Sequence, residues 1–99
     1  MTKERRLAIE MWKGIRDMLI HNDVVTHGDI IKYKQTFCVS HGLYWMNNCW
    51  FCKYIPLCSK CPVKYCSDGL YATVTERHKH KDIRIEACNG IIKALGGEA

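Results

Sequence analysis

The sequence predicts a mostly α-helical small domain of three to four helices, clasped by a four-cysteine zinc knuckle pair, with at most a short β-hairpin. Two observations predict it. Apolar residues recur every three or four positions in the N-terminal and C-terminal parts of the chain, which is the period of an amphipathic helix. Between those parts, five of the seven cysteines lie within residues 49–66.

The first two helices are expected over residues 2–20 and 27–40. Thr2 is placed to cap the first, and Gly14 to permit close packing within it. Thr26 and Asp29 have the spacing of a capping box before the second, which Gly42 should close in a left-handed conformation. The apolar positions expected inward are Leu7, Ala8, Met11, Trp12, Ile15, Met18 and Leu19, then Ile30, Ile31, Tyr33, Phe37 and Cys38.

The C-terminal part should contain a short helical stretch at 69–75 and a longer helix at 79–95. Gly96 and Gly97 should end the longer helix. The inward residues would be Leu70, Tyr71 and Val74, then Ile83, Ala87, Cys88, Ile91, Ile92 and Leu95. The chain is therefore predicted to be one domain. It has two N-terminal helices in 1–42, a metal-binding segment at 43–67 and a C-terminal helical segment at 68–97.

Length and composition limit the location and the chemistry. A domain of 99 residues has a modest core, so a metal staple has a clear physical use. No apolar run approaches the ~20 residues of a membrane span, and the first residues lack the apolar region of a signal peptide. We therefore expect a cytoplasmic protein, and in the cytoplasm clustered cysteines favour metal over disulfides.

The metal ligands expected from spacing are two CxxC pairs, Cys49 with Cys52 and Cys58 with Cys61. Four thiolates suit one Zn²⁺ and leave no position for water, so the site would be structural. The loop 53–57 is short, which leaves open a set in which Cys66 replaces Cys58 or Cys61. An iron–sulfur cluster is disfavoured because the tight ferredoxin-type cysteine run is absent.

Two further residues have metal-ligand spacing near the end of the second helix. Cys38 and His41 form a CxxH pair that could complete the zinc site or bind a second metal. The favoured interpretation is structural, with a buried cysteine and a histidine at a helix terminus. Cys88 is expected to pack in the core.

Two kinds of surface suggest partners. Trp50 and Tyr54 lie among the cysteines and could anchor a protein interface, although aromatic residues in small zinc domains usually cover the metal. A basic patch could instead contact nucleic acid. The alternative interpretation is that these basic residues are simply solvated at the start of a helix. The residues of this patch are Lys53, Lys60, Lys64, Arg77, Lys79 and Lys81.

The paired CxxC segment resembles a class of small uncharacterised phage and prophage proteins. In those proteins an NCxxCEY segment precedes a variable loop and CxxCPLxW, then a Leu-Tyr pair and an amphipathic helix. This chain has Asn48-Cys49 through Tyr54, then Cys58 through Tyr65. Lys53 replaces the usual acid and Tyr65 replaces the usual Trp. The resemblance covers residues 48–95 and implies that the two CxxC pairs bind zinc and that Cys66 does not. It implies no known activity.

Enzymatic activity is not expected. The sequence shows no Ser/His/Asp set, no glycine-rich phosphate loop and no HExxH motif. We expect a small zinc-stabilised binding protein of phage or mobile-element type, located in the host cytoplasm if it is phage-encoded. It would act as an adaptor or inhibitor of a host or viral protein, such as a defence or gene-expression component. The alternative is a nucleic-acid-binding accessory protein that uses the basic patch near the zinc site.

Replacing one predicted ligand tests the zinc site. Cys52→Ser should abolish stoichiometric zinc binding and lower the melting temperature sharply, because structural zinc contributes on the order of 10 kcal/mol to folding. Zinc content and thermal unfolding measure both effects, and Cys66→Ser is the matched control. A Cys52→Ser protein that folds normally and retains zinc would show that this account of the fold is wrong.

Overall fold

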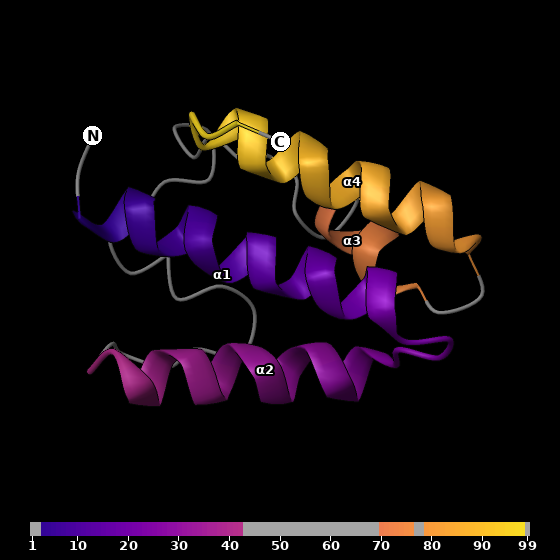
Figure 1. The fold of residues 1–99 in the computed structure, drawn as a ribbon, viewed down its shortest axis with the longest axis horizontal. Coiled ribbons are helices and arrows are strands. Elements are labelled where there is room, and N and C mark those ends of the chain that lie inside the picture. The colour runs from indigo at the N-terminus through magenta and orange to yellow at the C-terminus, as the bar shows by residue number, and fades with distance from the viewer. Residues whose placement is uncertain (1–2, 43–69, 77–78, 99) are drawn as a thin grey trace.

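The computed structural model describes residues 3–42, 70–76 and 79–98. Within those ranges the domain is mostly helical and contains no strand. Its four helices are α1 (Lys3–His21), α2 (His27–Ser40), α3 (Leu70–Thr75) and α4 (Lys81–Ala94). Helix α1 lies in the middle, with α2 on one side and α4 on the other, and α3 packs on α4 (Figure 1).

The start of α2 confirms the predicted capping box. The backbone N–H of Asp29 donates to the Thr26 hydroxyl at 3.1 Å, and the backbone N–H of Thr26 donates to the Asp29 carboxylate at 2.9 Å. Two of the amides that a helix start leaves without partners are satisfied in this way. The helix accordingly begins at His27, the predicted residue.

Glycines end α2 and α4 as the sequence predicts. Gly42 and Gly96 have φ of 66° and 94°, a region that favours glycine because it has no Cβ. After α4, the amide of Gly96 donates to the Lys93 carbonyl and that of Gly97 to the Ile92 carbonyl, both at 2.9 Å. This pair of bonds is the Schellman motif.

Helix α4 begins two residues later than predicted. His80 is its N-cap, and its Nδ1 accepts from the backbone N–H of Asp82 at 3.3 Å. The backbone of His80 is non-helical, with φ −58° and ψ 141°. The predicted start, at residue 79, was therefore two residues too early. The apolar pattern that predicted it does not detect a histidine that caps a helix.

One cluster of buried apolar side chains joins the helices. Most predicted inward positions lie in it, and Leu7, Met18 and Tyr33 pack against it while partly exposed. Ile83 was predicted to be buried but is 49% exposed, whereas Arg84 beside it is 5% exposed. Lys34, which was not predicted inward, is fully buried in α2. The buried apolar residues are Ala8, Ile9, Met11, Trp12, Ile15, Leu19, Val25, Ile30, Phe37, Cys38, Val74, Ala87, Cys88, Ile91, Ile92 and Leu95.

Helix α1 contacts its neighbours through different residues on its two sides. Towards α2, the ammonium group of Lys34 lies 5.8 Å from the centre of the Trp12 ring, within range of a cation–π interaction. Towards α4, Arg16 donates to the side-chain oxygen of Asn89 at 2.9 Å. Residues in the middle of α1 therefore contact both neighbouring helices.

Gly14 allows α2 to approach α1 closely. A Cβ atom added at Gly14 would lie 2.6 Å from Cζ of Tyr33 and closer still to its hydroxyl oxygen. The Tyr33 ring is half-buried there, and desolvation is the main cause that raises the pKa of its hydroxyl. Gly14 was predicted to permit close packing, and the residue that uses the space is Tyr33.

Substituting Gly14 tests this contact. Gly14→Ala should destabilise the fold by about 1–3 kcal/mol through overpacking, although alanine alone would favour an exposed helix by about 1 kcal/mol. Urea denaturation of the zinc-loaded protein measures the difference.

Gly28 supplies the matched control, because its added Cβ would meet only the Thr26 hydroxyl at 3.6 Å. Gly28→Ala should therefore be neutral or stabilising. In a Tyr33→Ala background the cost of Gly14→Ala should disappear. An unchanged cost in that background would place the clash elsewhere.

The capping box makes stability depend on pH. The hydrogen bond from the backbone N–H of Thr26 lowers the pKa of Asp29 below its ordinary 3.8. A carboxyl with a lowered folded pKa stabilises the fold above its unfolded pKa, and this stability is lost as the pH falls through the folded value. Asp29→Asn should therefore destabilise the zinc-loaded protein equally at pH 6 and pH 8, because both pKa values of Asp29 lie below that range.

Urea midpoints at the two pH values measure the effect. Asp17→Asn, at an exposed position within α1, is the control and should cost less at both pH values. No loss from Asp29→Asn at either pH would mean that the Asp29 carboxylate does not contribute to the cap.

Candidate functional site

The predicted zinc ligands lie outside the described residues. This holds for Cys49, Cys52, Cys58 and Cys61 and for the alternate ligand Cys66. Most of the predicted partner surface does too, namely Trp50, Tyr54, Lys53, Lys60, Lys64 and Arg77. Residues 3–42, 70–76 and 79–98 contain no group of three or more His, Cys, Asp or Glu side chains that could hold a metal. The zinc site therefore stays a prediction.

The alternate ligands Cys38 and His41 lie at the end of α2 in different surroundings. Cys38 is fully buried, and burial raises the pKa of its thiol, which opposes the thiolate that a metal requires. The exposed His41 ring stacks on Phe37 with centroids 4.1 Å apart, and its Nδ1 donates to the Phe37 carbonyl at 2.9 Å. These contacts favour structural roles, and metal binding by either residue stays a prediction.

Cys88 lies in the core of α4, as the sequence predicts. It is fully buried, and burial raises the pKa of its thiol to about 12. A thiol with such a pKa stays protonated near neutral pH and reacts slowly, because the thiolate is the nucleophile. Redox chemistry at Cys88 is therefore disfavoured by its surroundings.

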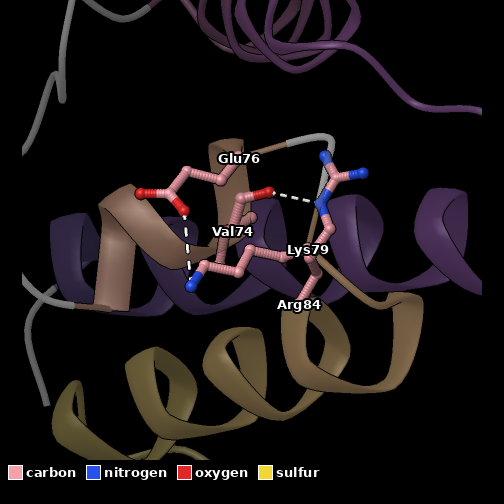
Figure 2. A network of polar contacts seen from close by, with 4 residues as sticks. All are labelled: Val74, Glu76, Lys79 and Arg84. Carbon is pink, nitrogen blue, oxygen red and sulfur yellow. Dashed lines mark hydrogen bonds and ion pairs between the residues drawn. The ribbon is translucent and has the colours of Figure 1, made fainter.

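Lys79 and Lys81 are the described members of the predicted basic patch. The Lys79 ammonium lies 3.8 Å from the Glu76 carboxylate (Figure 2), a partly exposed pair of small energetic weight. The Lys81 ammonium donates to the backbone carbonyl of Ile20 at 3.2 Å. Lys81 thus joins the start of α4 to the last turn of α1, where a cation is favourable.

Arg84 is a residue that the sequence analysis did not single out. Its Nε donates to the Val74 carbonyl at 2.8 Å, so the side chain reaches from α4 to α3 (Figure 2). Its Nη2 is buried and has no hydrogen-bond partner among the described residues. Burial lowers the pKa of the guanidinium, but arginine remains protonated in proteins. The charge therefore stays inside the domain with one donor unused.

The spacing of α4 contained a signal for Arg84. Positions 84, 88, 91 and 95 follow the helical period, and Cys88, Ile91 and Leu95 are buried. Arg84 continues that buried stripe by one turn towards the N-terminus of the helix. Ile83 was predicted to face inward and the charged Arg84 was not, although the helical period alone places Arg84 on the buried side.

Arg84, Lys79 and Lys81 line one small hollow between the end of α1 and the start of α4. The hollow has a volume of about 70 Å³. We call it the Arg84 hollow, and its described lining is Leu19, Asn22, Asp23, Val25, Lys79, Lys81 and Arg84. Three cations and one carboxylate give this lining a net positive charge.

A second, open groove follows the outer side of α4 beside α3. It has a volume of about 580 Å³, and Ile83, Ala87 and Gly90 are among its described lining residues. Glu86 and Lys93 bring opposite charges to it, so it has no single electrostatic character. We assign it no ligand.

None of the described helices combines the length and the continuous apolar sequence needed to cross a bilayer.

No protein-family model, curated protein or solved structure matches the chain. The resemblance to small phage and prophage proteins therefore stays a prediction.

Proposed function

We propose that this chain is a small zinc-stabilised binding protein of phage or mobile-element type, which acts as an adaptor or inhibitor by docking on an acidic surface of a host or viral protein. The supporting observation is the surface where α1 ends and α4 begins. Ile20 and Val24 are 45% and 71% exposed there, and Lys79 and Lys81 line a hollow that the residues following α1 also line, where the end of α1 lies near the start of α4 (Figure 1).

We call this set the aliphatic–cationic surface: Ile20, Val24, Lys79 and Lys81. Exposed aliphatic side chains near one another favour a protein interface, and charges around them select a partner of opposite sign. The Lys81 ammonium, held against the Ile20 carbonyl, brings charge and apolar surface together. The partner that fits is therefore a protein surface with carboxylates beside an apolar patch.

The alternative is a nucleic-acid-binding accessory protein. One observation favours it: Lys79 and Lys81 line the same hollow as Arg84, which gives a phosphate backbone cationic residues to contact. Nucleic-acid binding of this kind weakens steeply with salt. The protein interface should depend more on its aliphatic residues.

Site-specific crosslinking tests the proposed protein interface. A photoreactive benzoylphenylalanine replaces Val24, and the control carries it at Val39, which is equally exposed, at 72%, near the end of α2. In a bacterial lysate, position 24 should crosslink a specific protein and position 39 should not. Excess wild-type protein should suppress the crosslink, and Val24→Asp should compete at least about tenfold less well, the loss expected at an interface hot spot.

Equal crosslinking at positions 24 and 39, or none at position 24 that the wild type suppresses, would contradict a protein interface at this surface. Fluorescence anisotropy with labelled single-stranded and double-stranded DNA and RNA tests the alternative. Binding that weakens tenfold or more between low and physiological salt, and that Lys79→Glu with Lys81→Glu abolishes, would make nucleic acid the ligand.

A further inference from the structure

We propose that the Arg84 hollow is a binding site for one oxyanion group, either a phosphate or a carboxylate. The site is formed by the buried residue Arg84 together with Lys79 and Lys81, which line the same hollow. This inference does not rest on the proposed protein partner, because a free anion can occupy the hollow whether or not a macromolecule docks nearby.

The first argument is the unused donor of Arg84. The side chain is 5% exposed, its Nε donates to the Val74 carbonyl, and its buried Nη2 finds no hydrogen-bond partner within the part of the chain that the structure describes. A buried charged donor without a partner is unfavourable by more than a neutral one. A neutral acceptor in the hollow would reduce that penalty in part. A charged acceptor would remove most of it, because charge-assisted hydrogen bonds are stronger.

The second argument is the sign of the charge around the hollow. Asp23 is the one carboxylate among its described lining residues, beside three cations. Within the described part of the chain, Asp23 makes no ion pair with Arg84. Glu76 pairs with Lys79 at 3.8 Å, so Lys81 and Arg84 with Asp23 leave a smaller positive charge at the hollow, and this charge attracts an anion.

The third argument is position and size. The hollow adjoins the N-terminal turn of α4, whose partial positive charge favours anions. Lys81 covers the Ile20 carbonyl at the end of α1, which would otherwise repel one. A volume of about 70 Å³ exceeds the roughly 10–15 Å³ that one water needs. It is far below the roughly 300 Å³ of the smallest typical ligand pockets, so a single group fits rather than a whole cofactor.

Anion titration followed by NMR tests the proposal. Zinc-loaded protein is titrated with inorganic phosphate or with acetate against chloride at constant ionic strength, which holds general screening fixed. The side-chain Nε–H signal of Arg84 should shift saturably, with a dissociation constant of about 1 mM or tighter for one of the two oxyanions. Stronger binding of phosphate would indicate a phosphate-bearing ligand, and stronger binding of acetate a protein carboxylate.

Three variants separate the site from general charge. Arg84→Gln keeps a donor for the Val74 carbonyl but removes the guanidinium, and should weaken oxyanion binding about tenfold or more, as expected for one charge-assisted hydrogen bond. Lys79→Gln with Lys81→Gln should weaken binding without altering the core. Lys93→Gln, an exposed cation in the last turn of α4, is the matched control and should bind like the wild type.

Several outcomes would overturn the proposal. The first is no saturable shift with either oxyanion in the wild type, and the second is equal weakening by Lys93→Gln and the Lys79/Lys81 variant. The third is undiminished binding by a folded Arg84→Gln protein. If Arg84→Gln does not fold, the lysine variants and the wild-type Arg84 signal still decide. Because no macromolecule is present, failure here leaves the crosslinking test of the proposed function untouched.

Discussion

The fold depends on burying α1 from two sides at once. The helix has α2 on one side and α4 on the other (Figure 1), and its residues Met11 and Ile15 are fully buried. A helix covered by a single partner needs only one apolar stripe. Ile9, which lies outside the stripe predicted for α1, is buried as well and would contact a Cβ placed at Gly97 after α4. The close approach at Gly14 on the α2 side and the Arg16–Asn89 hydrogen bond on the α4 side are local contacts that support the burial of α1.

Local signals predicted the helices well because the relevant interactions are local. The period of apolar residues, the Thr26–Asp29 cap and the left-handed glycines involve residues within one turn of each other, so a short stretch of sequence contains them. The boundaries of α2 followed directly. The start of α4 did not, because His80 caps it through a ring nitrogen, a role that helix-capping preferences do not assign to histidine.

Predictions failed where burial and charge compete. Lys34 and Arg84 occupy inward positions of α2 and α4, and hydrophobicity alone places such residues outside. Lys34 lies over the Trp12 ring, and Arg84 bonds the Val74 carbonyl. Both partners belong to other helices, so the sequence of α2 or of α4 alone does not identify the partner residue. The candidate oxyanion site was missed for that reason, although two of its lysines had been placed in a basic patch.

In this topology, a zinc site at the predicted cysteines would stabilise the connection between α2 and α3. Helix α2 ends on one side of α1, and α3 begins on the other (Figure 1), so residues 43–69, which contain five cysteines, connect two layers that the central helix separates. Ordering a long connection costs conformational entropy, and a crosslink within it reduces that cost. A metal bound by two CxxC pairs would leave six residues, 43–48, before the site and eight, 62–69, after it. It would thereby fix α3, a helix of six residues too short to be stable alone, against α4, where Arg84 holds the Val74 carbonyl.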